Sequence, residues 1–125
     1  GEQVLWPDHC VQGSSGAMFH EKLNTLRADL VIRKGSNSKI DSYSAFFEND
    51  KKTPTGLHGY LNARGVTDLT FVGLATDYCV AYSALDAARL NFKVSVDTGL
   101  CRAIDADGSL EKALTEMKLE KVNLI

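Results

Sequence analysis

Four short runs of apolar and β-branched residues are separated by segments in which apolar side chains recur every three or four positions. The runs span residues 29–33, 69–74, 93–96 and 121–125, and their composition is typical of β-strands. Strands that alternate with helices form a parallel sheet with crossover helices. The pattern therefore predicts an α/β fold, a doubly wound, Rossmann-like parallel sheet with helices on both faces.

Three helices are predicted between these strands. The first covers residues 57–64, after a possible N-cap at Thr55 and before Gly65, which suits a C-terminal cap. The second runs from about Thr76 to Asn91, and the third follows a possible cap at Ser109. Apolar residues at helical spacing predict their inner faces: Val80, Ala84, Ala87 and Ala88 in the second helix, and Leu110, Ala113, Leu114 and Met117 in the third.

The segment 35–54 follows neither period and is rich in turn-forming residues. A connection this long in a compact domain is usually functional or disordered. Its aromatic residues, Tyr43, Phe46 and Phe47, favour a packed loop. The loop also begins where the run 29–33 ends, and ligands of open α/β sheets bind outside the carboxyl ends of strands.

Composition excludes several classes of function. The formal charge of −2 gives no reason to expect nucleic acid or an anionic membrane as a partner, and no apolar run approaches the roughly 20 residues of a membrane span. Three cysteines with no paired spacing favour reduced thiols in the cytoplasm. No domain boundary interrupts residues 1–125, so we expect a single domain. Because the chain opens almost directly into a dense motif, we also expect that a preceding segment is missing.

Cys79 is the first candidate for chemistry. It lies in the sequence GLATDYCV, residues 73–80, where a predicted strand runs directly into a predicted helix. The unpaired N–H groups and the dipole of a helix N-terminus favour a negative charge, so a thiol there is expected to be more often the nucleophilic thiolate. A buried structural thiol is the alternative.

Lys34 and His9 are further candidates. Lys34 ends the run 29–33 just before the long loop, so in a central parallel strand its ammonium group would reach the ligand crevice near Cys79 and favour the thiolate. The alternative is a solvated lysine. His9 lies in the rigid sequence WPDHC, residues 6–10, but one histidine cannot make a metal site without two or more further ligands.

These segments together resemble the nicotinamidase/pyrazinamidase family, within the isochorismatase-like cysteine hydrolases. The resemblance covers nearly the whole chain and is carried by WPDHCVQGSSGAMFH (6–20), VIRKG (31–35), DSYSAFF (41–47), GLATDYCV (73–80) and ALDAARLNFKVSVDTGLCRA (84–103). It implies an amidohydrolase that converts nicotinamide, or similar ring amides such as pyrazinamide, to the acid and ammonia through a cysteine thioester, in NAD salvage.

The resemblance also implies roles for particular residues. Cys79 would be the nucleophile and Lys34 a member of an Asp–Lys–Cys triad. The backbone N–H groups of Ala75 and Cys79 would form the oxyanion hole, with a cis peptide between Leu74 and Ala75. The substrate ring would lie against a set of mostly aromatic residues: Trp6, Tyr43, Leu74 and Tyr78.

His9 would be one ligand of a divalent metal (zinc, or iron or manganese) that binds the pyridine nitrogen. The triad aspartate and an Asp-x-His pair of metal ligands have no match in this chain. We therefore expect that the chain is the C-terminal two-thirds of a hydrolase domain that lacks its N-terminal strand. Alone it would be inactive, and its partner would be the missing segment, a second copy, or both.

Three other readings stay open. Another amidase of the same superfamily could act on a carbamoyl or ureido group, although His9 argues against it because the ring-binding metal is a nicotinamidase feature. A non-catalytic relative would suit the absent aspartate, but it leaves Lys34, His9 and Cys79 together by coincidence. A thiol redox protein is disfavoured because the chain has no CxxC pair.

Overall fold

The structure, a computed structural model, describes residues 3–125. The chain divides into two compact units, the first ending at Val31 and the second beginning at Ile32. In the described part of the first unit the only helical turn is η1 (Ser15–Ala17), and the remaining residues are turns and irregular backbone. None of the helices within residues 3–125 is long and apolar enough to cross a membrane.

The predicted strand at 29–33 is wrong. These residues have irregular backbone, and Leu30 and Val31 are exposed. A run of β-branched residues becomes a strand only where a neighbouring strand pairs with its N–H and C=O groups. Within residues 3–125 the three strands of the sheet pair only with one another, so this run has no strand partner.

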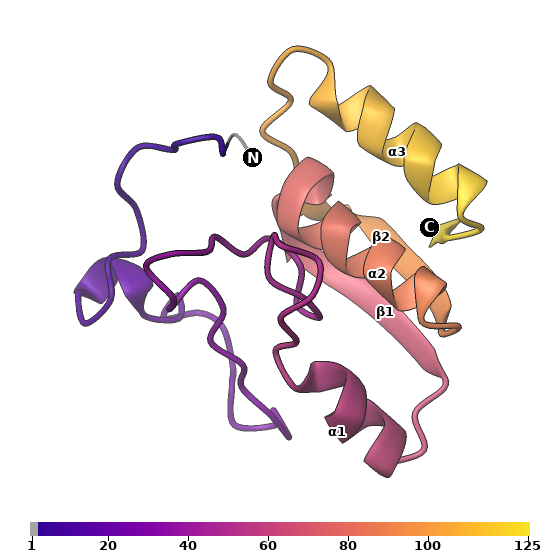
Figure 1. Ribbon diagram of the computed structural model, residues 1–125, viewed down its shortest axis with the longest axis horizontal. Coiled ribbons are helices and arrows are strands. Elements are labelled where there is room, and N and C mark those ends of the chain that lie inside the picture. Colours follow the sequence, from indigo (N-terminus) through magenta and orange to yellow (C-terminus); the bar gives the residue numbers. More distant parts are fainter. Residues whose placement is uncertain (1–2) are drawn as a thin grey trace. The chain divides into compact units, whose positions relative to one another are not determined.

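The second unit contains a parallel three-stranded sheet in the order β1-β2-β3 (Figure 1). Its strands are β1 (Asp68–Leu74), β2 (Lys93–Arg102) and β3 (Asn123–Leu124). Helix α2 (Ala81–Arg89) connects β1 to β2, and α3 (Ser109–Leu119) connects β2 to β3. The predicted α/β class with a parallel sheet is confirmed. Strand β2 is longer than predicted, and its pairing with β1 shifts register between Phe71 and Gly73.

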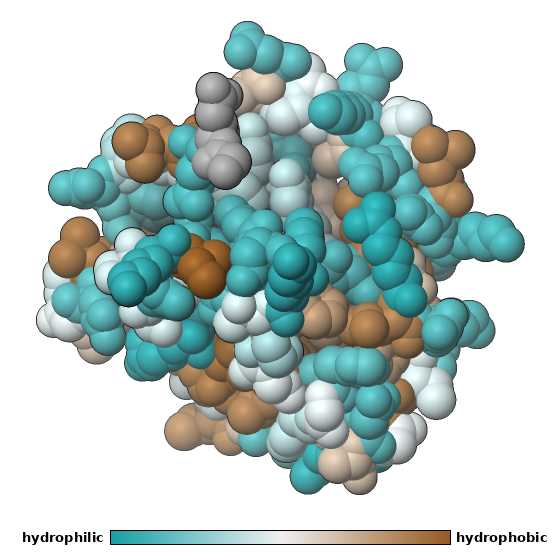
Figure 2. All heavy atoms as spheres, in the orientation of Figure 1, coloured by the Kyte–Doolittle hydropathy of each residue, from teal (hydrophilic) through white to brown (hydrophobic). Residues whose placement is uncertain are grey.

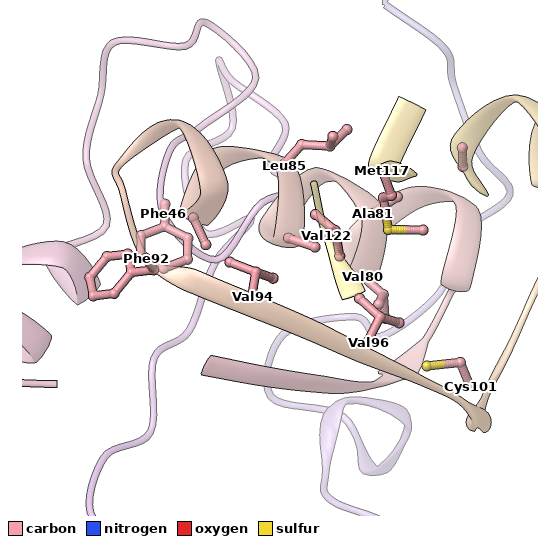
Figure 3. Packing of buried hydrophobic residues seen from close by; sticks show 13 residues of the cluster. Phe46, Val80, Ala81, Leu85, Phe92, Val94, Val96, Cys101, Met117 and Val122 are labelled. Atoms are coloured by element: carbon pink, nitrogen blue, oxygen red, sulfur yellow. The ribbon is translucent and has the colours of Figure 1, made fainter. Parts of the chain in front are cut away.

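The hydrophobic core lies between this sheet and the connecting helices (Figure 3). The predicted inner faces are largely confirmed. Val80, Ala84 and Ala87 are buried while Ala88 packs at the edge of the core, and Ala113 and Met117 are buried in α3. Helical spacing identified these positions because every third or fourth side chain of a helix faces the same neighbour.

The predicted helix starts need correction. The second helix begins as a π-helical turn, η2 (Thr76–Val80), before α2 continues it. The first helix, α1 (Leu57–Ala63), has Gly56 as its N-cap, although the Thr55 hydroxyl accepts a hydrogen bond from the Leu57 N–H. Gly108, with φ +79°, caps α3 in place of Ser109. Glycine takes these positions because positive φ is strained for other residues.

The loop 35–54 is packed, as its aromatic residues indicated. Phe46 is only 1% exposed, and its ring meets those of Phe71 and Phe92 at centroid distances of 6.4 and 5.9 Å. The loop residues around Phe46 are therefore anchored in the hydrophobic core. Some large apolar side chains are exposed instead, Leu119 among them. On the face shown in Figure 2, brown apolar residues lie among teal polar ones.

Candidate active site

Cys79 lies in the π-helical turn between the end of β1 and α2. The Tyr78 and Val80 N–H groups both donate to the Ala75 carbonyl, at 3.1 Å each, so the turn is wound around that oxygen. The Cys79 side chain is half-buried. The peptide bond between Leu74 and Ala75 is cis, as the resemblance implied. The predicted strand-to-helix junction at the thiol is therefore present.

The ammonium group of Lys34 lies beside the thiol. Its Nζ is 3.3 Å from the Cys79 Sγ and donates a second hydrogen bond to the Ser42 carbonyl at 2.9 Å. The structure thus brings together two residues 45 positions apart, although the strand expected to carry Lys34 does not form. The contact places the side chain of Lys34 directly against the candidate nucleophile.

An aromatic cluster adjoins this pair. The Tyr43 ring meets Tyr78 and Tyr82 edge to face, at centroid distances of 5.7 and 5.2 Å. Tyr43 and Tyr78 were predicted to contact the substrate, and Tyr82, which the sequence analysis did not single out, adds a third ring to their cluster. Its spacing of four from Tyr78 was the available signal, since such residues share a helix face. Burial, with the neighbouring Tyr43, Glu116 and Tyr78, raises the pKa of Tyr82 above its ordinary value.

Asp77 was also missed, and it joins the nucleophile's turn to the segment before α3. Its buried carboxylate accepts hydrogen bonds from the Ile104 N–H (3.0 Å), the Asp105 N–H (2.8 Å) and the Ser109 hydroxyl (2.6 Å). Burial alone would raise the pKa of Asp77, but the hydrogen bonds from Ser109, Ile104 and Asp105 outweigh burial and lower it. The charged form therefore holds η2 to this segment.

A small hollow of about 200 Å³ lies between η2, α2 and α3. Its walls include Asp77, Tyr78, Tyr82 and Ser109, but neither Cys79 nor Lys34. Because the thiol and the ammonium group do not line it, this hollow is separate from the candidate chemistry. The candidate site is defined by the Cys79–Lys34 contact instead.

The other residues predicted for the site differ in how far they are exposed to solvent. Leu74 ends β1 and is 72% exposed, and Ala75 follows it half-buried. Trp6 and His9 belong to the first unit, where Trp6 is half-buried and His9 exposed. The His9 Nδ1 lies 2.7 Å from the Pro7 carbonyl, which can only accept, so Nδ1 carries the proton. In the neutral ring this leaves the Nε2 lone pair for a ligand, an arrangement common among metal-binding histidines.

Within residues 3–125, no three His, Cys, Asp or Glu side chains are grouped closely enough to hold a metal ion. The second unit by itself brings together Cys79, Lys34, Tyr43 and Tyr78.

Comparison with known proteins bears on what this arrangement does. The isochorismatase domain model matches residues 1–125. The chain is 50% identical to the nicotinamidase of Acinetobacter baylyi over 125 residues, which is 100% of this chain and 58% of that protein. The chain thus spans little more than half the length of this relative.

Solved structures of similar proteins share the fold of this chain. A nicotinamidase/pyrazinamidase of Acinetobacter baumannii superposes with a TM-score of 0.96 at 52% identity, covering 98% of this chain and 59% of that one. A protein of L. infantum in complex with nicotinate has a TM-score of 0.92 at 40% identity, covering 97% and 60%. A pyrazinamidase of Pyrococcus horikoshii in complex with zinc has a TM-score of 0.82 at 31% identity, covering 97% and 63%. With its whole length matched by the family model, the chain belongs to the isochorismatase domain family.

Proposed function

We propose that this chain carries the nucleophile of a nicotinamidase, an amidohydrolase that cleaves the carboxamide C–N bond of nicotinamide. The observation that carries the proposal is the 3.3 Å contact between the Lys34 ammonium group and the Cys79 sulfur. It occurs at the strand-to-helix junction of a chain that is 50% identical to a nicotinamidase over its whole length. Pyrazinamide-like ring amides belong to the same substrate class.

The proposed reaction is acyl transfer in two stages. The Cys79 thiolate, stabilised by Lys34, attacks the carboxamide carbon, and the backbone N–H groups of Ala75 and Cys79 stabilise the resulting oxyanion. The C–N bond then breaks, and the nitrogen takes up a proton and leaves as ammonia. Water next attacks the thioester, releasing nicotinic acid and restoring the thiolate.

The flat ring of the substrate would be held by aromatic side chains. Tyr43 and Tyr78 already meet edge to face, and Tyr43 directly follows Ser42, whose carbonyl accepts a hydrogen bond from Lys34. Offset and edge-to-face contacts are the arrangements that aromatic rings prefer. By the family resemblance, Trp6 and Leu74 would complete these contacts.

The resemblance also assigns a divalent metal to the complete protein, and a zinc complex of a pyrazinamidase relative supports this class of cofactor. His9 would contribute one ligand through Nε2. Such a metal would bind the pyridine nitrogen and so orient the ring. Because zinc, iron and manganese all accept imidazole and carboxylate ligands, the donor set does not select among them.

The leaving ammonia needs a proton donor, which the family pattern supplies as an aspartate. Asp77, although only two residues from Cys79, already accepts three hydrogen bonds from Ile104, Asp105 and Ser109. We therefore propose that a further segment of a single hydrolase domain, or a second copy of this chain, completes the site. The product, nicotinic acid, places the reaction in pyridine nucleotide salvage, for which we propose a cytoplasmic location.

Ammonia release from nicotinamide tests the proposal. It is measured for this chain alone, and then for the chain mixed with or fused to the part of the Acinetobacter baylyi nicotinamidase that it does not match. We expect activity only with the added part, and its loss in Cys79→Ala. If a folded, metal-loaded mixture releases no ammonia from nicotinamide but consumes a carbamoyl or ureido compound, the substrate belongs to that class and is not nicotinamide.

A further inference from the structure

A serine outside the proposed catalytic residues connects the nucleophile to the loop that holds Lys34. Ser83, in the first turn of α2, is only 5% exposed. Its hydroxyl donates to the Cys79 carbonyl at 2.6 Å and accepts from the Ala45 N–H at 2.9 Å. One buried oxygen therefore bonds both the backbone of the nucleophile and a loop residue 38 positions away.

The same loop contacts the nucleophile by a second route. The Lys34 Nζ donates to the Ser42 carbonyl at 2.9 Å and lies 3.3 Å from the Cys79 Sγ. Segment 42–45 is thus fixed relative to Cys79 at both ends: at Ser42 through an ammonium group, and at Ala45 through a hydroxyl. These contacts form a closed ring that begins and ends at Cys79.

A serine hydroxyl in a helix often bonds the carbonyl four residues earlier, and that contact alone would be unremarkable. The Ala45 N–H has no place in that local pattern. It comes from the loop, and the Ser83 oxygen supplies its acceptor in a part-buried position. A part-buried N–H needs a partner, so removing this hydroxyl would release the segment or leave the group unpaired.

We propose that Ser83 is a positioning residue: its hydroxyl holds segment 42–45 against Cys79, so that the Ser42 carbonyl keeps the Lys34 ammonium group at the sulfur. The proposal deepens the function proposed above, and its catalytic consequence rests on that function. Its effect on the thiol does not, because thiolate formation can be followed by alkylation without any substrate.

The test is alkylation of the intact protein by iodoacetamide at pH 7, followed for each cysteine by peptide mass spectrometry. Cys10 is exposed and Cys101 is buried, so they report reagent reactivity and unfolding within the same molecule. In Ser83→Ala we expect alkylation of Cys79 to slow about fivefold, the factor that corresponds to one net hydrogen bond. Cys10 should react as before and Cys101 should stay protected. Ser83→Thr, which keeps the hydroxyl, should restore the rate.

The direction of the change separates positioning from plain structural support. Loosening the fold would expose Cys79 and Cys101 and speed the alkylation of both, whereas displacing Lys34 slows Cys79 alone. Rates are compared over reaction times at which Cys101 stays unmodified, so partial unfolding of the alanine variant does not obscure the result. In a Lys34→Met background, Ser83→Ala should have no further effect on Cys79, because the group through which Ser83 acts is gone.

Thr55→Val is the matched control. The Thr55 hydroxyl donates to the Ala45 carbonyl at 2.6 Å and accepts from the Leu57 N–H, and in the described part of the chain it makes no hydrogen bond to Cys79. Its Cys79 alkylation should match the unsubstituted protein. Unchanged or faster alkylation of Cys79 in Ser83→Ala would overturn the proposal. Slower alkylation of Cys79, in a protein that releases no ammonia from nicotinamide even after the part of the Acinetobacter baylyi nicotinamidase that this chain does not match is added, would instead refute the substrate and leave the positioning role intact.

Discussion

Replacing Asp77 by asparagine tests how much of the stability of the nucleophile's turn depends on one buried charge. The carboxylate is 5% exposed and accepts from two backbone N–H groups and one hydroxyl, at 2.6 to 3.0 Å. Asparagine has the same shape, but one of its two terminal atoms is a donor. In either orientation the NH2 of its amide faces a backbone N–H, that of Ile104 or that of Asp105, and this N–H loses its acceptor.

The expected cost follows from these contacts. A hydrogen bond to a charged group contributes about 1.5–3 kcal/mol, and the bonds that survive in the variant lose their charge assistance. We therefore expect Asp77→Asn to lower the free energy of unfolding by about 2–3 kcal/mol at pH 7. Asp77→Ala, which removes all three acceptor contacts, should cost more.

The pH dependence of this cost has a definite sign. The pKa of Asp77 is lowered in the folded protein, so its stabilisation is fully present above its pKa in the unfolded chain and is lost as pH falls through the folded value. The difference between the unsubstituted protein and Asp77→Asn should therefore be constant from pH 7 to about pH 5 and shrink below about pH 4.

Urea unfolding at pH 7, 5 and 3 measures these differences, with Asp50→Asn as the matched control. Asp50 also accepts from two backbone N–H groups and one hydroxyl, those of Lys52 and Thr53, but it is exposed to solvent. Water can replace its lost contacts, so this variant should be clearly less destabilised. Equal losses in the two variants, or a difference for Asp77→Asn that persists undiminished at pH 3, would refute the role given to the buried charge.

Three further predictions follow from the packing and the site. Phe46→Ala should lower the free energy of unfolding by about 3–5 kcal/mol in urea titrations, because it empties a fully buried ring position. Glu120→Ala should cost less than about 1 kcal/mol in the same assay, although Glu120 lies 3.1 Å from Arg89, because both side chains are well exposed. Lys34→Met should reduce ammonia release from nicotinamide by at least about 100-fold in the completed protein, while the unfolding midpoint moves little; full activity would remove Lys34 from the mechanism.

Local pattern was sufficient for most of the second unit. The runs at 69–74 and 93–96 and the inner faces of α2 and α3 were predictable because each is decided by which side chains a strand or helix turns toward the core. The run 29–33 has the same composition as those strands, yet it forms none. Strand formation depends on a pairing partner, and no local pattern reports whether one is in place.

The contacts that shape the site were less accessible to sequence reasoning. Ser109 was predicted as a helix cap, but its hydroxyl donates to Asp77, 32 positions earlier in the chain. Nothing in the sequence distinguishes Ser83 from other helix residues, and its proposed role depends on the Ala45 N–H, 38 positions away. Small polar side chains bond whichever partner the fold brings to them, so their spacing in the sequence carries little information about that partner.

The segment 42–47 explains why Lys34 still reaches Cys79 when its predicted strand is absent. Burial alternates along this irregular stretch: Ser42, Ser44 and Phe46 are buried, and the residues between them are half-exposed. The two serines can occupy buried positions because their polar groups bond backbone, as when the Ser44 hydroxyl accepts from the Phe46 N–H. Phe46 fixes one end of the segment in the core, and the Ser42 carbonyl at the other end receives Lys34. The position of the ammonium group is therefore set by the loop it contacts more than by a strand that carries it. It follows that substitutions in the loop and at Ser83 should change the reactivity of Cys79, whereas Asp77→Asn should change chiefly the stability of the turn.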